Sequence, residues 1–357
     1  MANISPITNL DFFATKEALK TFLKNQDRFK DYDYEGSNMN VLLDVLSYNT
    51  FYNNYYYNMA ISEMFLDSAS QRNSVLSHAK ELNYLPRSRR SSALKCDISF
   101  SMAASYLSNF LTIPAGTTFS GRCGNKTYIF LNDIAYIASR SASNNTVFQV
   151  TNVDLYEGRK INEILSIANT TLSNEWVDTS SITLTVNGNV FTYKSEIFGV
   201  AAADPVFYLQ PENDGKYSIQ FGQNKFGFQP TITDVITVSY RICSGPEANG
   251  VNSLTLPSAF GGASSNTITV TSQSANGYYA EDIESIRTFA PKALQVQERA
   301  VTKRDYEVLL RSRFPNIQAI SVYGGDEIDP PQYGKVIISV DVTGGEGAAD
   351  YETLKTI

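Results

Sequence analysis

Residues 36–90 read GSNMNVLLDVLSYNTFYNNYYYNMAISEMFLDSASQRNSVLSHAKELNYLPRSRR, and this stretch decides how the chain begins to fold. Its spacing predicts a helix, a turn and a second helix. Apolar, tyrosine and asparagine side chains recur in the first helix at steps of three and four, as expected for one helical face. The members of this stripe are Leu42, Val45, Leu46, Asn49, Tyr52, Asn53, Tyr56, Met59 and Ala60. The face of the second helix comprises Ala69, Val75, Leu76, Ala79 and Leu82.

The ends of the second helix carry recognisable signals. Asp67 is a candidate N-cap, because an aspartate oxygen accepts a hydrogen bond from the first turn. Asn83 suits the left-handed residue that closes a helix, and Pro86 prevents continuation.

The tyrosines of this hairpin allow two interpretations. A buried tyrosine needs a partner for its hydroxyl, and the neighbouring asparagine amides can supply one. The residues alone therefore favour a hairpin packed on its own domain. Aromatic side chains are also enriched in the cores of protein interfaces, so the same stripe suits contact with another chain.

Composition describes a folded protein with several domains. The 357 residues are 43% hydrophobic and 18% charged, enough for two or three domains with a sizeable core. A net charge of −7 argues against non-specific binding to nucleic acid or to acidic membranes. No secretion signal and no membrane-spanning apolar run are visible. Three widely spaced cysteines, Cys96, Cys123 and Cys243, favour reduced thiols and argue against a zinc cluster.

The texture of the sequence predicts a multidomain α+β fold. A helical N-terminal region gives way to alternating patterns typical of strands, with a sandwich-like or barrel-like centre, and helical periodicity then returns. The predicted parts are an N-terminal helical bundle region (1–92), a first β-rich domain (93–158), a second β-rich domain (159–250), a linker with one strand (251–278) and a small α/β region (279–357).

Local signals refine this division. The first helix is predicted over 9–30 with Phe13 and Phe22 inward and Lys16 and Lys20 outward. The pair Asn187-Gly188 predicts a tight hairpin.

The C-terminal region has signals of its own. A helix over 281–289 is expected to stop at Pro291, and Thr302 with Asp305 predicts a capping box. Strands are expected over 317–323 and 335–342, with a further helix from Ala348. An order of helix, two strands and helix leaves an open sheet edge, so we expect the region to be truncated or completed by a separate chain.

Candidate catalytic groups have simple structural explanations. The lone histidine, His78, lies on a helix without a nearby acid or nucleophile in the sequence. Carboxylates for glycoside cleavage are conceivable among Asp204, Glu212 and Asp214, but Asp214 precedes a glycine in a turn. The sequence therefore predicts a protein that is not an enzyme.

Candidate ligand sites are equally weak. Asp326, Glu327 and Asp329 lack EF-hand spacing. The run GEGAAD at 345–350 lacks the third glycine and the space of a dinucleotide site. The basic cluster of Arg87, Arg89 and Arg90 lacks interleaved aromatics and favours a solvated linker or a protein contact over nucleic acid. No cofactor or metal is expected.

Three segments resemble a known family. The first comprises EGSNMNVLLDVLSYNT (35–50) and NYYYNMAISEMFLDSASQRNSVLSHAKELNYLPRS (54–88). The second, 204–252, contains an FG-x-x-x-x-G turn, and the third, 277–340, contains acidic-x-x-x-x-IR-x-x-AP and RAVT-x-x-DYE elements. These motifs resemble the inner-ring baseplate wedge subunit of T-even-type contractile phage tails, within the J-type baseplate family. The motif positions are Phe221, Gly222, Gly227, Ile286, Arg287, Pro291, Arg299, Asp305 and Tyr306.

The resemblance implies a structural virion protein of the tail baseplate, assembled in the host bacterial cytoplasm. Such subunits join a second wedge protein through helical bundles, pair with other copies of themselves, and contact neighbouring baseplate and sheath-initiating proteins. They build a ring around the tail hub that rearranges on sheath contraction. The bundle helices would be 38–58 and 67–83, with Leu42, Val45, Leu46, Asn49, Tyr52, Tyr56, Met59 and Leu76 as interface residues. No nucleic acid or membrane partner is implied.

Two rival functions remain open at this point. Many tyrosines on a β-rich scaffold also suit a glycan-binding or glycan-cleaving tail component. A generic β-sandwich adhesion module is a further alternative, although the helical first quarter counts against it.

Overall fold

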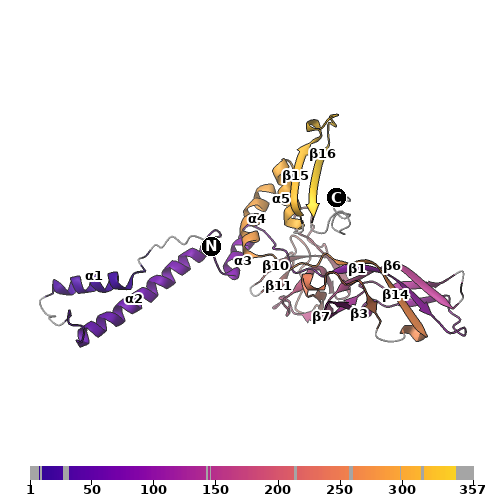
Figure 1. Ribbon diagram of the computed structural model, residues 1–357, viewed down its shortest axis with the longest axis horizontal. Coiled ribbons are helices and arrows are strands. Elements are labelled where there is room, and N and C mark those ends of the chain that lie inside the picture. Colours follow the sequence, from indigo (N-terminus) through magenta and orange to yellow (C-terminus); the bar gives the residue numbers. More distant parts are fainter. Residues whose placement is uncertain are drawn as a thin grey trace. The chain divides into compact units, whose positions relative to one another are not determined.

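The computed structural model confirms a multidomain α+β fold with helical, β-rich and small mixed parts (Figure 1). It describes residues 8, 10–26, 32–141, 144, 146–212, 215–256, 260–297, 299–314 and 317–342. The chain divides into two compact units, Met1–Glu81 and Leu82–Ile357. The division into five parts stays a prediction.

The first unit contains α1 (Phe12–Lys24), α2 (Asn38–Glu63) and α3 (Arg72–Glu81). Helix α1 lies antiparallel along α2, as Figure 1 shows. The predicted orientation of α1 is wrong for Phe13, Phe22 and Lys16. Phe13 and Phe22 are 75% and 63% exposed, whereas Lys16 faces α2 and pairs with Asp44 at 2.5 Å. The facing side of α2 carries a carboxylate, so the lysine stem packs there and its charge is paired.

The corner between α2 and α3 is organised by Glu63. Its carboxylate accepts hydrogen bonds from the backbone N–H of Ser70 at 2.8 Å and of Gln71 at 3.2 Å, directly before α3 begins. This places a negative charge at the N-terminus of a helix, where the helix dipole favours it. Asp67 was predicted for this role, and that prediction is wrong because the helix begins five residues later, at Arg72. Asn83 has the expected positive φ of 55°.

Eight of the described strands form the first sheet of the second unit. They are β1 (Ala93–Ser101), β2 (Phe110–Ile113), β3 (Thr118–Cys123), β4 (Lys126–Leu131), β5 (Tyr136–Arg140), β6 (Val147–Glu157), β13 (Leu254–Thr255) and β14 (Ser265–Ala275). The main path is β13-β3-β4-β6-β1-β14, and β2 joins through β5 to β6. Successive side chains of a strand point to opposite faces, and the inward-facing Phe100, Phe119, Phe130 and Phe148 are buried in the core of this sheet. The segment predicted as a linker with one strand therefore adds two strands here.

A second sheet follows in the order β11-β10-β9-β8-β12-β7. Its strands are β7 (Arg159–Leu165), β8 (Val177–Val186), β9 (Asn189–Tyr193), β10 (Val206–Pro211), β11 (Tyr217–Gln220) and β12 (Ile236–Ile242). The predicted hairpin at Asn187 and Gly188 is confirmed, since both have positive φ and join β8 to β9. Tyr240 and Phe207 are fully buried in its core. Short 3₁₀ helices lie at Gly245–Ala248, Phe260–Gly262 and Gly325–Glu327.

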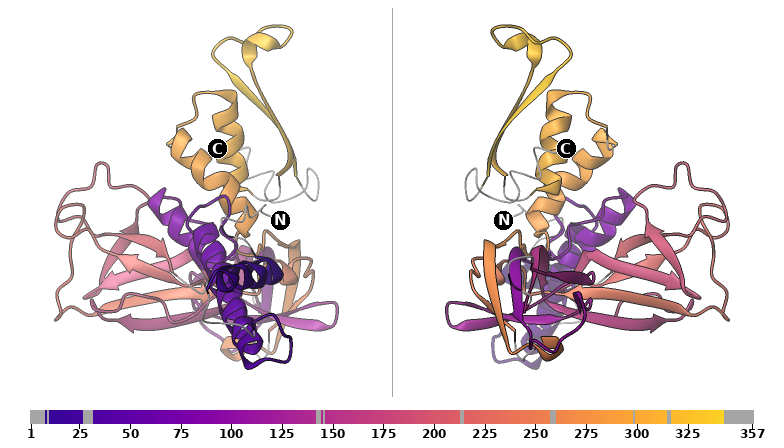
Figure 2. Two further views of the ribbon diagram at one scale, coloured as in Figure 1. Left: turned by 90° about the vertical axis from the view of Figure 1, so that its left-hand side faces the viewer. Right: turned by 90° about the vertical axis from the view of Figure 1, so that its right-hand side faces the viewer.

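The C-terminal part comprises α4 (Ile283–Val296), α5 (Lys303–Arg313), β15 (Ile317–Gly324) and β16 (Val336–Val342). Figure 2 shows the β15–β16 hairpin beside the two helices, and α5 contacts β15. The capping box of Thr302 and Asp305 is confirmed. Pro291 does not stop α4, which continues to Val296 and ends at Gln297 in the left-handed conformation. The helix predicted from Ala348 lies outside the described residues.

The FG-x-x-x-x-G motif forms a tight turn after β11, in the connection to β12. Phe221 is buried against Phe191, with ring centroids 6.1 Å apart. The Gly222 carbonyl accepts from the N–H groups of Lys225 at 3.0 Å and Phe226 at 2.9 Å. A Cβ on Gly222 would lie 2.1 Å from the Phe226 carbonyl oxygen, and Gly227 has φ +120°. The motif's glycines are thus required by close backbone approach and by a left-handed conformation.

Gly222→Ala should lower the free energy of unfolding of this region by about 2–3 kcal/mol, because the methyl group meets rigid backbone. Urea unfolding followed by fluorescence of the single tryptophan, Trp176, measures it. Gly188→Ala is the matched control: nothing lies within 4 Å of its Cβ, so only the strain of a positive φ costs stability, about 1 kcal/mol. A cost for Gly222→Ala no larger than that of the control would contradict this account of the turn.

The Glu63 corner should weaken in acid. Partial burial raises the pKa of Glu63, but hydrogen bonds from Ser70, Ser74 and Gln71 outweigh it and leave the pKa below its ordinary value of 4.5. Its stabilising contribution is therefore present above that value and is lost as pH falls through the pKa of the folded state. Hydrogen-exchange protection of α3, corrected for intrinsic rates, should fall with pH in wild type but not in Glu63→Gln. Glu81→Gln, whose side chain is 76% exposed, should keep the wild-type response. An equal pH response in wild type and Glu63→Gln would refute this role.

Candidate partner interface

Helix α2 starts at a defined cap and runs for 26 residues. Ser37 is the N-cap, and its side chain accepts from the Asn40 N–H at 3.1 Å. Glycine and proline are absent from the helix sequence, so nothing interrupts its backbone hydrogen bonds. Its length allows several turns to present side chains on one continuous surface.

The side of α2 that is covered within its unit is largely polar. Its buried residues are Asn40, Leu43, Ser47, Asn58 and Ser62. Asn58 exchanges hydrogen bonds with the backbone of Thr8, accepting at 3.1 Å and donating at 3.2 Å. Because asparagine and serine contribute little apolar area, this side supplies little hydrophobic stabilisation.

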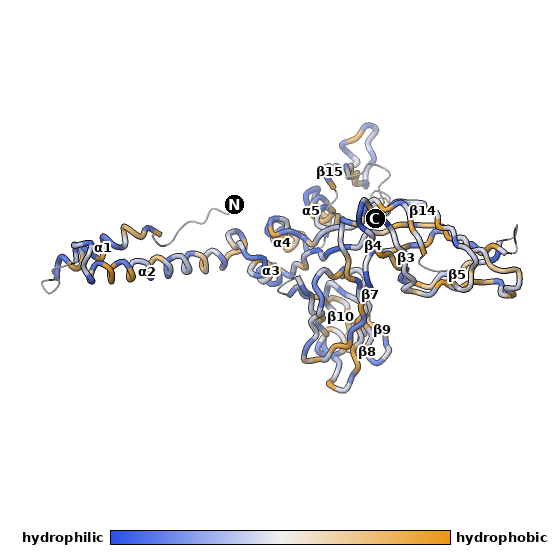
Figure 3. The backbone as a smooth tube through the Cα atoms, turned by 60° about the horizontal axis from the view of Figure 1, so that its bottom comes forward, coloured by the Kyte–Doolittle hydropathy of each residue, from blue (hydrophilic) through white to orange (hydrophobic). Residues whose placement is uncertain are grey.

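The apolar and aromatic side chains of α2 point outward instead. We call this surface the α2 outer face. Its members, all at least 40% exposed, are Val41, Leu42, Val45, Leu46, Tyr48, Tyr52, Tyr55, Tyr56 and Tyr57. Figure 3 shows apolar positions recurring along the length of this helix. A surface helix of a globular domain usually turns such a stripe toward its own core, so the pattern here is inverted. Large exposed apolar patches of this kind mark interaction surfaces.

Tyrosines on the outer face are ordered against one another. The Tyr48 hydroxyl donates to the Tyr52 hydroxyl at 2.9 Å, and their ring centroids are 4.6 Å apart. The Tyr56 ring follows, with its centroid 6.3 Å from that of the Tyr52 ring. The hydrogen bond to Tyr52 raises the pKa of Tyr48, so this hydroxyl stays neutral. Prearranged rings lose little side-chain freedom when a partner covers them.

Charge is nearly absent from α2. Among its 26 residues, Asp44 and Glu63 are the charged ones. Asp44 pairs with Lys16, and Glu63 holds the start of α3. A partner of the outer face therefore meets tyrosine hydroxyls, asparagine amides and aliphatic groups rather than ions. Contacts of this chemistry are insensitive to salt, because screening acts on charges.

The predicted interface residues separate into two groups. Leu42, Val45, Leu46, Tyr52 and Tyr56 are on the outer face, Asn49 is exposed beside them, and Met59 is half-buried. Leu76 is only 3% exposed and packs inside the first unit, so the structure does not present it to a partner. Sequence reasoning missed Val41, Tyr48, Tyr55 and Tyr57, because it assumed one narrow stripe. The run YYY at 55–57 is itself the signal of a wider face, since consecutive helical residues cannot all be buried on one side.

The remaining motif positions have structural roles in different elements. Ile286 is fully buried in α4, which also contains Pro291, and Arg287 pairs with Glu284 at 2.6 Å. Arg299 donates to Gln297 beyond that helix.

The RAVT-x-x-DYE element caps α5. The Asp305 carboxylate accepts from the Thr302 N–H at 2.8 Å, and this bond holds the pKa of Asp305 below its usual range. Tyr306 donates its N–H to the Thr302 carbonyl in the first turn. These motif positions do not converge on a common site.

Candidate catalytic and ligand groups are dispersed. The ring of His78 lies 3.0 Å from the Glu63 carbonyl and thus packs locally. The Glu212 carboxylate accepts from Ser218 and that of Asp204 from the N–H of Ala201, both as turn contacts. Within the described residues, no three His, Cys, Asp or Glu side chains are grouped to hold a metal ion. None of the described helices is long and apolar enough to cross a membrane. Asp214 and residues 345–350 lie outside the described residues.

Comparisons with known proteins point to one family. Residues 11–84 match the model of the helical domain of gp6-like baseplate wedge proteins, and residues 302–353 match C-terminal domain I of the baseplate structural protein gp6. The chain is 29% identical over 349 residues to baseplate wedge protein gp6 of Enterobacteria phage T4, across 87% of this chain and 51% of that protein. It thus spans about half the length of this relative. The resemblance to baseplate wedge proteins is confirmed.

A solved structure is also similar at low level. The cryo-EM structure of the anti-feeding prophage baseplate includes a chain with 14% identity and a TM-score of 0.30, over 88% of this chain and 67% of that one.

Proposed function

We propose that this chain, whose sequence is that of a baseplate wedge protein, is a structural component of the baseplate of a contractile phage tail. The observation that carries the proposal is the α2 outer face, which lies within the segment matching the gp6-like helical domain. A helix whose apolar side is exposed needs another surface to cover that side, and assembly into a baseplate would supply one. The work of such a protein is to hold interfaces, so we propose that it is not an enzyme.

The size of the outer face suits a stable assembly. Full burial of one large apolar side chain contributes about 1.5–3 kcal/mol. Covering the exposed parts of nine such side chains contributes on the order of 10 kcal/mol before the costs of association. Tyrosine, with its large apolar body and polar tip, is among the residues that dominate interface energies.

The partners follow from this surface and from the family. We propose that α2 enters a helical bundle with a second wedge protein and with other copies of this chain. Neighbouring baseplate and sheath-initiating proteins would contact other surfaces. Assembly would take place in the host bacterial cytoplasm, and the finished ring around the tail hub would rearrange when the sheath contracts. Such a rearrangement needs interfaces with two stable arrangements.

The double substitution Tyr52→Ala with Tyr56→Ala should block assembly while leaving the sheets folded. Each ring is a candidate hot spot worth about 2 kcal/mol or more, so the affinity for the wedge partner should fall about 100-fold or more. Co-purification from cells that co-express the virion proteins measures the loss, and circular dichroism monitors the fold.

Tyr333→Ala is the control, because Tyr333 is 81% exposed but belongs to the second unit and is far from α2 in sequence. It should co-purify like wild type. Normal complex formation by the folded double variant would show that the outer face is not the interface.

A further inference from the structure

A short strap opens the second unit. We define it as residues 84–90, which begin three positions after the last residue of the helical unit, Glu81. The strap runs beside the segment that leads into α4. Arg90 and Tyr278 exchange backbone hydrogen bonds at 3.1 and 3.2 Å, and the Glu281 N–H donates to the Arg87 carbonyl at 3.0 Å. Two segments nearly two hundred residues apart in sequence are therefore joined at the start of the C-terminal part.

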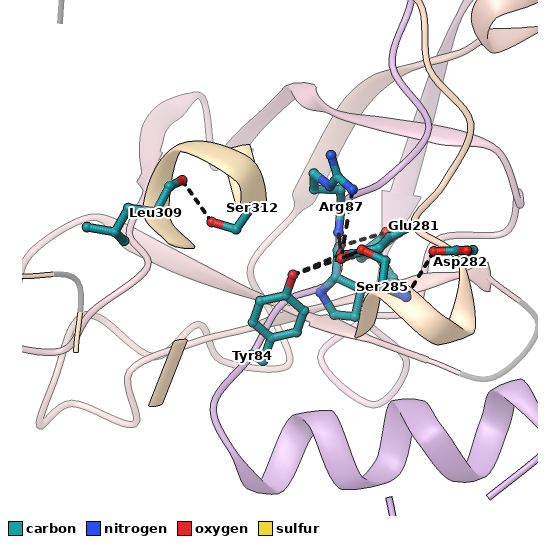
Figure 4. Close-up of polar contacts among 9 residues, drawn as sticks. Tyr84, Arg87, Glu281, Asp282, Ser285, Leu309 and Ser312 are labelled. Carbon is teal, nitrogen blue, oxygen red and sulfur yellow. Dashed lines mark hydrogen bonds and ion pairs between the residues drawn. The ribbon is translucent and has the colours of Figure 1, made fainter. Parts of the chain in front are cut away.

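The Glu281 side chain lies at this junction, as Figure 4 shows. It is 0% exposed. The Tyr84 hydroxyl lies 3.0 Å from each of the two carboxylate oxygens. Oε2 also accepts from the Arg87 N–H at 3.0 Å, and Oε1 accepts from the Ser285 hydroxyl at 2.5 Å. The Arg87 guanidinium stands 3.8 Å away.

These donors come from two sides. Tyr84 and Arg87 belong to the strap, and Ser285 belongs to the first turn of α4. Burial, followed by the charge of Glu281, raises the pKa of Tyr84, so its hydroxyl remains a donor. A buried carboxylate is stable only while its hydrogen bonds and its ion pair persist. If either the strap or α4 moved away alone, the carboxylate would lose the donors that this segment supplies.

Glu281 belongs to a sequence motif, but the sequence alone assigns it no contact. Glu281 is the acidic position of the acidic-x-x-x-x-IR-x-x-AP element, and Ile286 of the same element is fully buried. Tyr84 and Arg87 lie at the end of the N-terminal motif. The hydrogen bonds thus join two motifs that the sequence shows only as separate.

We propose that Glu281 is a latch that makes the strap and the first turn of α4 open and close as one unit. A displacement of the strap is then passed to α4 instead of being absorbed between them. Its use in a rearranging baseplate rests on the proposed function, but the latch itself is a property of the isolated chain.

Hydrogen exchange of the isolated full chain tests the latch. In Glu281→Gln, one oxygen becomes a donor and the charge is lost, so amide exchange should rise roughly tenfold to a hundredfold in both 84–90 and 283–289. Both segments should show the same factor. Tyr84→Phe, which removes one hydroxyl, should raise exchange in the same two segments by a smaller shared factor.

Glu163→Gln is the matched control. Glu163 also accepts from a tyrosine hydroxyl, that of Tyr240 at 2.7 Å, but it lies within the second sheet. It should leave exchange in the strap and in α4 unchanged.

Three outcomes would overturn the latch: faster exchange in only one of the two segments, no change in either, or an equal rise in the control. If Glu281→Gln loses exchange protection throughout both sheets, the variant is unfolded and Tyr84→Phe is the test instead. The latch then requires that Tyr84→Phe raise exchange by the same factor in 84–90 and in 283–289. None of these results depends on a partner, so failure of the latch and failure of the wedge assignment are separate results.

Discussion

The side of α2 that is covered within its own unit is asparagine and serine apart from Leu43, while its valines, its tyrosines, Leu42 and Leu46 face outward. Hydrophobic burial is the main favourable term in folding, and this helix leaves most of that term unused within its own unit. The Lys16–Asp44 pair links α1 to α2, and Asn58 of α2 binds the backbone of Thr8, but such contacts contribute little net stability at a surface. We therefore expect the first unit to gain stability when a partner surface covers the outer face.

The sheets of the second unit are built in the opposite way. Each has its own apolar core, with Phe100, Phe119 and Phe130 fully buried in one and Phe207 and Tyr240 in the other. Local devices such as the Gly222 turn and the Asn187-Gly188 hairpin define their connections. The β-rich part thus has apolar cores of its own, whereas we propose that the helical unit shares its stability with a partner. This division suits a component that must fold before it assembles.

Patterns with a local cause were predictable from the sequence. The capping box at Thr302, the hairpin at Asn187 and the left-handed Asn83 each depend on residues within a few positions, and each is confirmed. The direction of an amphipathic face was not predictable, because periodicity shows which residues share a side but not which side is covered. Phe13 and Phe22 were placed inward for this reason, and Leu76 was assigned to an interface although it is buried. Long-range pairs such as Glu281 with Tyr84 leave no sequence signal, since their spacing is set by the fold.

The most direct test of the central claim is the mass of the full chain, alone and co-expressed with the virion proteins of the same phage, together with hydrogen exchange of α2. The outer-face account predicts a defined hetero-complex in which the amides of α2 become protected. It also predicts that this complex persists in about 1 M salt, where electrostatic contacts are screened beyond about 3 Å. A stable monomer that ignores every virion partner, or a complex in which α2 exchanges as fast as in the free chain, would contradict it.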